Sequence, residues 1–141
     1  MKKTMVTAVS VLMAIAMIFC FAACGGNDGG SGNNNDEANI TKYIADNNLE
    51  ATLADLGQGI MDVKVSANGS SLVLDMNISI DLSAEQLSSI EGSAAELLDG
   101  MESSAQEMIT ELKDKVGVAA PSVVININKK DGSNIATKTF K

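Results

Sequence analysis

The chain has 141 residues, which is enough for one domain of ordinary size and too few for two separate cores. It carries 18 acidic residues against 10 lysines, has no arginine and no histidine, and has a net charge of −8. This composition argues against nucleic-acid binding and against attraction to anionic lipid headgroups, since both need cationic contacts. The lack of histidine also excludes Ser-His-Asp triads, and together with the absence of a free cysteine in the mature chain it excludes the common zinc sites.

Residues 1–23 have the three parts of an export signal: a basic start, an apolar run over about residues 6–21, and small residues before a cleavage site. The segment leads into the sequence FAAC at residues 21–24, which resembles the lipobox of bacterial lipoproteins. The resemblance implies that Cys24 is thioether-linked to diacylglycerol and becomes the first residue of the mature chain. A membrane-spanning anchor and an ordinary secreted protein are the alternatives, but the apolar run is short for a span.

Removal of the signal would discard Cys20, and acylation would occupy Cys24, so no thiol would remain for a disulfide, a metal or catalysis. The mature chain would carry a net charge of −10, because two lysines leave with the signal. Residues 24–38 then form the lipidated cysteine and a flexible tether rich in Gly and Asn, about 20 Å in mean reach. We expect a single domain over residues 39–141.

The domain begins with helical spacing of apolar residues in two clusters, which are interrupted by Asn47-Asn48. The clusters are Ile40, Tyr43 and Ile44, and then Leu49, Leu53 and Leu56. Residues 57–59, with the sequence GQG, end the second helix. The sequence therefore predicts one bent helix or two short helices.

Two alternating runs flank Asn68-Gly69 and predict a β-hairpin. A two-residue turn at this pair would place Ala67 opposite Ser70 and Met61 opposite Met76, with the apolar residues of both strands on one face.

A long amphipathic helix follows, with Ser83 and Gln86 as a capping box and a predicted end near Val116 at Gly117. Gly92 and Gly100 weaken its middle and permit a bend. Its outer face is acidic, with Glu85, Glu91, Glu96, Asp99, Glu102, Glu107, Glu111 and Asp114. A solvated face is the usual meaning of such a stripe, and recruitment of a basic partner is the alternative.

The last segment predicts a second hairpin around residues 130–132. A two-residue turn would set Lys138 against Ile125 on the buried face, whereas a bulged three-residue turn sets Thr137 there and leaves Phe140 outside. The bulged register spares a buried charge and is our prediction. The order α-β-β-α-β-β then predicts an α+β fold, a four-stranded antiparallel sheet with helices on one face.

Asp62 and Asp75 are the one irregularity of the first hairpin, because its predicted register places these two acids opposite each other on the outer face. A weak calcium site, completed by Asn77 or Asp81, would relieve the repulsion. Solvation beside Lys64 is the simpler interpretation. We therefore assign no metal and no cofactor.

The sequence permits two further chemistries. The mature chain has four methionines, all predicted to face the core: Met61, Met76, Met101 and Met108. Their thioethers could bind Cu(I), but packing in the core is the commoner role of methionine. A pair of carboxylates could serve a glycosidase, yet the mature chain has only two aromatic residues, Tyr43 and Phe140, for stacking on sugars. We assign no catalytic residue and expect no enzyme activity.

Residues 40–141 resemble a family of small lipoproteins from Gram-positive gut bacteria that carry one domain of unknown function. The resemblance rests on Tyr43-Ile44, on MDVKVSANGSSLVLDMNI at residues 61–78, on the acidic helix, and on VVININKKDGSNIATKTF at residues 123–140. It implies an anchored domain at the outer face of the cell membrane, and it implies no activity, substrate or cofactor. We expect a non-enzymatic interaction module whose partners are the membrane, through the lipid, and another envelope protein; a carboxylate hydrolase or calcium-dependent binder is the alternative.

Overall fold

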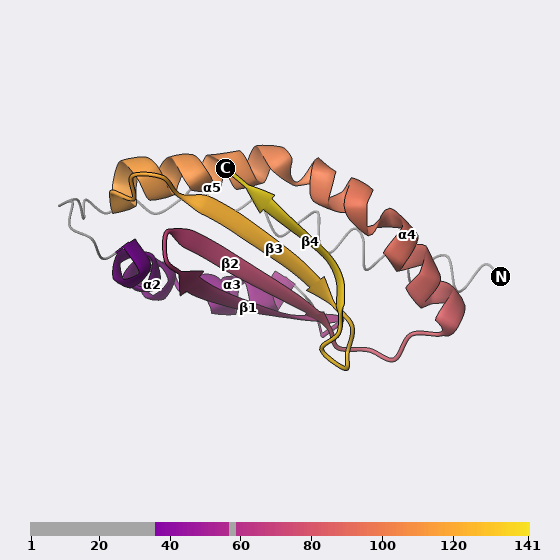
Figure 1. The fold of residues 1–141 in the computed structure, drawn as a ribbon. Coiled ribbons are helices and arrows are strands. Elements are labelled where there is room, and N and C mark those ends of the chain that lie inside the picture. Colours follow the sequence, from indigo (N-terminus) through magenta and orange to yellow (C-terminus); the bar gives the residue numbers. More distant parts are fainter. Residues whose placement is uncertain (1–35, 57–58) are drawn as a thin grey trace.

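The computed structural model describes residues 36–56 and 59–141 (Figure 1). The predicted signal segment, Cys20, Cys24 and nearly all of the predicted tether lie outside the described residues. The elements in chain order are α2 (Asp36–Asp46), α3 (Leu49–Leu56), β1 (Met61–Asn68), β2 (Ser71–Ile78), α4 (Ala84–Gly100), α5 (Glu102–Glu111), the π-helical turn η1 (Leu112–Val116), β3 (Ser122–Asn128) and β4 (Asn134–Phe140).

Of the two predicted alternatives for the N-terminal segment, the structure has two short helices, and Asn48 separates them with a positive φ of 50°. Asn adopts this left-handed conformation more readily than most residues, which explains the break. Ile40 is fully buried, and Tyr43 is among the partly buried side chains packed on the same core. Helix α2 begins at Asp36, so residues 36–38, which we assigned to the tether, belong to the folded part of the chain.

The first hairpin has the predicted faces but a different turn. Its loop residues are Gly69 and Ser70, and Asn68 ends the strand opposite Ser71. Gly69 has a φ of +58° and Ser70 has no positive φ, the pattern of a type II′ turn, which favours Gly at its first central position. The register is therefore shifted by two residues from the predicted one, which leaves every side chain on its predicted face.

The predicted antiparallel sheet is wrong at its centre. The strand order is β1-β2-β3-β4, and β2 pairs with β3 in parallel, while both hairpins are antiparallel. The segment between the two central strands runs back along the sheet as α4, α5 and η1, so that β3 starts beside the start of β2 (Figure 1). A crossover helix of this kind joins parallel strands, and the fold is an α+β domain with a mixed sheet.

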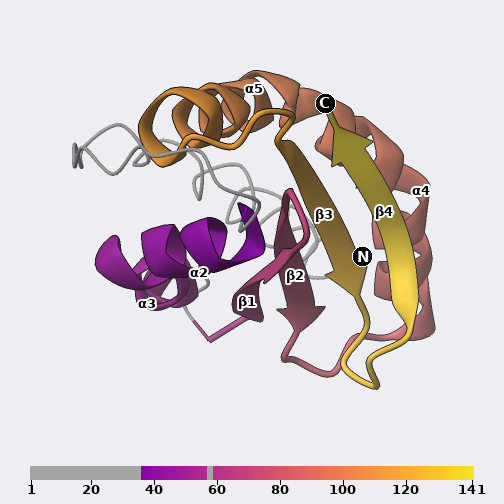
Figure 2. The same ribbon diagram turned by 60° about the vertical axis from the view of Figure 1, so that its left-hand side comes forward.

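The predicted capping box is present at the start of α4. The Ser83 side chain accepts a hydrogen bond from the backbone N–H of Gln86, and the Gln86 side chain accepts one from the backbone N–H of Ser83. The helix changes direction at Met101, directly after Gly100, where the bend was expected. Gly117 ends it with a φ of 83°. The bends let one long segment arch over the sheet (Figure 2).

The second hairpin adopts the register that we rejected. Lys138 faces Ile125 and Phe140 faces Val123, with the irregularity placed between Ile127 and Asn128 rather than at Gly132. Phe140 is thereby buried to 4% exposure instead of lying on the outer face. Burial of a Phe side chain is worth about 1.5–3 kcal/mol.

The charge of Lys138 does not oppose this register, because its side chain stays partly exposed and its Nζ pairs with an acid of α4. It lies 2.5 Å from Asp99 Oδ1 and 5.0 Å from the centroid of the Phe140 ring. A long lysine stem can cover apolar surface while its ammonium group stays near water.

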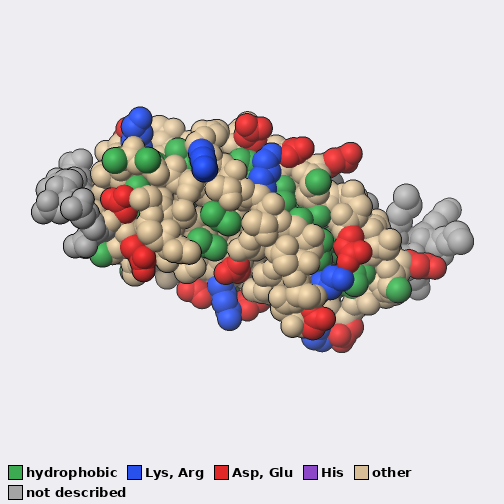
Figure 3. Space-filling view, in the orientation of Figure 1, with side chains coloured by type: hydrophobic (Ala, Val, Ile, Leu, Met, Phe, Trp, Pro, Cys, Tyr) green, Lys and Arg blue, Asp and Glu red, His purple; other side chains and the backbone are tan. Residues whose placement is uncertain are grey.

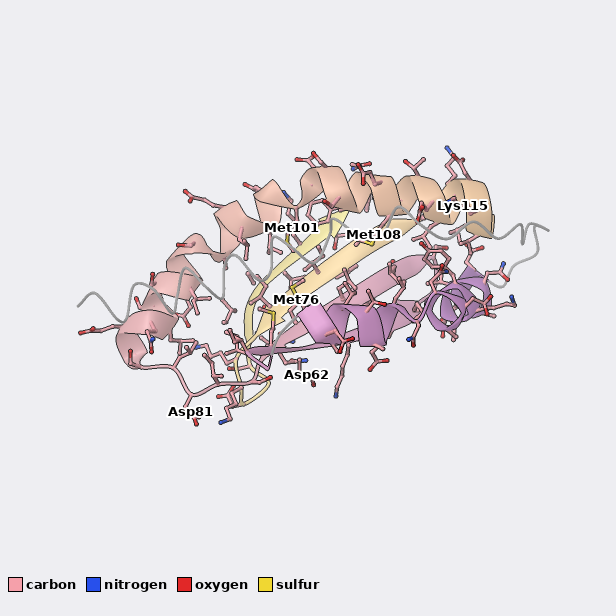
Figure 4. The ribbon with its side chains drawn as sticks, turned by 180° about the vertical axis from the view of Figure 1, so that it is seen from behind. Asp62, Met76, Asp81, Met101, Met108 and Lys115 are labelled. Atoms are coloured by element: carbon pink, nitrogen blue, oxygen red, sulfur yellow. The ribbon has the colours of Figure 1, made fainter. Side chains whose placement is uncertain are left out.

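A single core lies between one face of the sheet and the helices. The inward residues of β1, β2 and β3 are buried in strict alternation. All four predicted core methionines are buried, and Figure 4 shows Met76, Met101 and Met108 in the space between the helical arch and the sheet. Their burial confirms the prediction that they face the core.

Candidate functional site

The candidate calcium ligands are not brought together. Asp62 lies opposite Asn77, and Asp75 lies opposite Lys64, because the turn is one residue later than predicted. The predicted juxtaposition of the two acids was therefore wrong. Asp75 accepts a hydrogen bond from the amide of Asn126 on β3 instead, at 2.6 Å.

Asp81, the other candidate helper, lies in the loop after β2 and pairs with Lys130. Figure 4 shows Asp62 and Asp81 pointing away from the core. Within residues 36–56 and 59–141 there is no group of three or more acidic, His or Cys side chains arranged to hold a metal ion.

The outer face of the sheet has hydrogen-bonded rows of polar side chains across its strands. Asn126 donates to Asp75 and accepts from Thr137 at 2.8 Å, and in the next row Asn128 donates to Asn77 at 3.0 Å. Figure 3 shows this side of the molecule, where backbone and uncharged side chains, drawn in tan, lie among hydrophobic groups and scattered charged groups. These side chains largely satisfy one another, so the rows stabilise the pairing of the central strands.

A second polar cluster joins α2 to the end of the helical arch. The phenol of Tyr43 donates to Glu111 Oε2 at 2.6 Å, and Lys115 donates to the other carboxylate oxygen at 2.7 Å. Burial, the hydrogen bond to Glu111 and the charge of that carboxylate raise the pKa of Tyr43 above its usual range. The polar groups of this cluster are hydrogen-bonded to one another, and their contacts hold α2 against the end of the helical arch.

A shallow, open pocket of about 190 Å³ lies where β2 and β3 end. The loop after β2, the first turn of α4 and the β3–β4 turn surround it, and its lining residues are Ile78, Ile80, Asp81, Leu82, Leu87, Lys129, Lys130 and Asp131. Because β2 and β3 are parallel, the carboxyl ends of both strands meet here.

The walls of the pocket are apolar and its rim is charged. Ile80, Leu82 and Leu87 are half-buried, so their side chains keep apolar surface in contact with water. The two lysines of the rim are paired, Lys129 with Glu91 of α4 and Lys130 with Asp81. These ion pairs fasten the β3–β4 turn to the helix and to the loop that face it.

The other acid of the rim, Asp131, is exposed and held ionised. Hydrogen bonds from the hydroxyl and then the backbone N–H of Ser133 hold the pKa of the Asp131 carboxyl below its usual range. A general acid needs a raised pKa, so Asp131 is unsuited to that role.

Three acids of the stripe on the long helix have partners inside the domain. Glu91 and Asp99 pair with lysines of the second hairpin, and Glu111 binds Tyr43. Most of the other acids of the stripe are exposed and solvated, in keeping with the usual meaning of such a face.

The architecture defines a small α+β domain in which a helical crossover arches over a mixed four-stranded sheet. Residues 40–140 match the model of a family described as a domain of unknown function, DUF4854, and the chain belongs to this family. No curated protein and no solved structure shows significant similarity to it. None of the described helices has both the length and the apolar character needed to cross a membrane.

The pocket was missed in the sequence, although a signal for it was present. A long helical segment between two strands is typical of a β-α-β unit, whose parallel strands end on the same side. That pattern would have placed the loop at residues 79–83 beside the turn at residues 129–133. Our prediction instead has the helix cover an antiparallel sheet.

Proposed function

We propose that the chain is an exported lipoprotein, held on the outer face of the cell membrane by acyl chains on Cys24, and that its domain is a non-enzymatic interaction module. Residues 1–23 supply the pattern of an export signal, and FAAC at residues 21–24 supplies the lipobox-like ending. The family domain covers residues 40–140, which leaves the preceding residues for export, acylation and spacing.

The pocket at the carboxyl ends of β2 and β3 is the observation that carries the interaction role. It combines half-buried aliphatic side chains with a polar rim, the arrangement found at small recognition sites. The rim offers charged groups for polar contacts with a partner, since Asp131 accepts hydrogen bonds from Ser133 and Asp81 is paired with Lys130.

Site-directed photo-crosslinking in cells that produce the full chain tests the interaction role. A photo-reactive residue at Leu82, in the pocket, should give a discrete crosslinked protein species. The same residue at Ser66, which is exposed on the outer face of β1, is the matched control and should not give that species. Crosslinks of equal yield at both positions, or at neither, would contradict the proposal.

Fractionation of the same cells tests the anchor separately. The wild-type chain should sediment with membranes, and Cys24→Ser should be released from them or remain unprocessed. A Cys24→Ser chain that matures and stays on the membrane would show that acylation is not the anchor.

A further inference from the structure

The β1–β2 turn carries the only Asn-Gly pair of the sequence, Asn68-Gly69. Both residues are exposed. An asparagine that precedes a glycine is prone to deamidation, because the glycine has no side chain to hinder the attack of its nitrogen on the asparagine amide. The contacts of this pair in the folded domain therefore decide how readily it reacts.

The reaction joins two atoms of the pair. The backbone nitrogen of Gly69 loses its proton and forms a bond with Cγ of the Asn68 side chain. The bond from that carbon to the amide nitrogen breaks, and the amide nitrogen leaves as ammonia. Water then opens the cyclic imide at either of its carbonyls, which gives aspartate or isoaspartate. Water is the co-reactant, and no atom is oxidised or reduced.

The attacking nitrogen is held by the first turn of α2. The Gly69 N–H donates to Glu37 Oε2 at 3.0 Å, and the Ser70 hydroxyl donates to Asp36 Oδ2 at 2.6 Å. Figure 2 shows the start of α2 beside this turn. A hydrogen bond from the protonated nitrogen and a negative charge close to it both oppose loss of the proton. Glu37 therefore keeps the nitrogen in its unreactive form.

The strand conformation of Asn68 acts in the same direction. Asn68 ends β1 and pairs with Ser71 across the turn. Closure of the imide ring requires the Asn68 side chain and the Gly69 nitrogen to lie on the same side of the Cα–C bond, whereas the extended backbone of a strand turns them apart. The turn must open before it reacts, and its hydrogen bonds to Asp36 and Glu37 oppose that opening.

Modification would weaken the contact that prevents it. Both products carry a carboxylate in place of the Asn68 amide, beside the carboxylates of Asp36 and Glu37, and isoaspartate also lengthens the main chain at the end of β1. Because like charges repel, the first turn of α2 would bind the modified turn less well. The loss of ammonia is irreversible, so each opening that leads to reaction leaves a permanent mark.

We propose that Asn68 is a deamidation site and that docking of the first turn of α2 on the β1–β2 turn controls its rate. The site lies at the opposite end of β2 from the pocket and is independent of the interaction role proposed above. Glu37 is the residue that protects it.

Incubation of the full chain in detergent micelles at mildly alkaline pH tests the proposal, with mass spectrometry of the digested peptide that carries Asn68 as the readout. Glu37→Ala should accelerate the formation of isoaspartate at Asn68 about fivefold, because it removes one exposed hydrogen bond to a charged group. The chain unfolded in urea should react faster still. Glu50→Ala, which removes an exposed acid from the first turn of α3, is the matched control and should react as wild type does.

A general loss of stability would also open the turn, and a second variant separates the two causes. Ser83→Ala removes the cap of α4 beyond the other end of β2 and should leave the rate at Asn68 unchanged. Equal acceleration by Ser83→Ala and Glu37→Ala would overturn the proposal, as would equal rates in Glu37→Ala and wild type. A slower reaction in Glu37→Ala would show that the carboxylate acts as a base and would likewise overturn it. The same holds for a folded wild-type chain that reacts as fast as the chain in urea.

Discussion

Replacing Tyr43 by Phe removes one hydroxyl from the contact between α2 and the end of the helical arch. Glu111 then loses its 2.6 Å donor but keeps Lys115 at 2.7 Å. Hydrogen bonds to charged groups contribute about 1.5–3 kcal/mol. The phenol is only half-buried, so water replaces part of the lost bond, and we expect a decrease of about 1 kcal/mol in the free energy of unfolding.

Urea unfolding followed by circular dichroism measures this change, since the chain has no Trp and the substitution removes its single Tyr. A loss of about 1 kcal/mol corresponds to a fall of about 4–8 °C in Tm for a domain of this size. Glu111→Gln in both backgrounds completes a double-mutant cycle, and it should show that the two side chains are coupled. Additive effects of the two substitutions would refute the assigned contact.

The same hydroxyl predicts a dependence of stability on pH. The pKa of Tyr43 is raised in the folded chain, while in the unfolded chain it lies near 10. The contribution of the phenol to the free energy of unfolding is therefore complete below pH about 10 and is lost as the pH rises above that value. The loss is at most about 1.4 kcal/mol per pH unit, and it is smaller for a partly exposed group such as this one. Because Tyr43 is the only Tyr, its near-ultraviolet absorbance reports this titration alone; ionisation near pH 10 in the folded chain would contradict the assigned contact.

Four further substitutions test the corrected fold by urea unfolding. Phe140→Ala should lower the free energy of unfolding by about 3 kcal/mol, because the ring is buried against β3; a loss below about 1 kcal/mol would favour the register with Phe140 outside. Lys138→Met keeps the apolar stem and removes a partly exposed ion pair, so the free energy of unfolding should change by no more than about 1 kcal/mol. A loss above about 2 kcal/mol would contradict this account of Lys138. Ser83→Ala should cost about 1 kcal/mol by removing the cap of α4, and no loss would contradict that cap. Gly117→Ala should also cost about 1 kcal/mol, since its φ is 83°, and an unchanged stability would contradict the left-handed helix end.

Local signals in the sequence predicted the helices and the faces of the strands well. The capping box at Ser83, the break at Asn48 and the left-handed end at Gly117 depend on neighbouring residues alone. The burial of the four methionines followed from the period of two in the strands and from helical spacing.

Registers and strand order were less predictable because they depend on contacts between distant segments. The Asn68-Gly69 pair is typical of a type I′ turn, but Asp36 and Glu37, 30 or more residues earlier, bind the turn formed by Gly69 and Ser70. A two-residue shift of register keeps the apolar faces aligned, so the hydrophobic pattern does not distinguish the two turns.

In the second hairpin, the predicted cost of a buried lysine was misleading. The Lys138 ammonium reaches Asp99 on α4, and that partner is not visible from the strand itself. Burial of Phe140 decides the register once the lysine is satisfied. The candidate site was missed for the same reason, since the pocket exists only where two loops about 50 residues apart meet at the ends of parallel strands.

The central claim is the proposed acyl anchor on Cys24, which would determine where the domain is displayed. Intact-mass spectrometry of the full-length product, extracted from the membranes of a producing bacterium, tests it most directly. The account predicts a chain that begins at Cys24 and carries the added mass of a diacylglyceryl group. A product that retains residues 1–23, or one cleaved there without acyl chains, would contradict it.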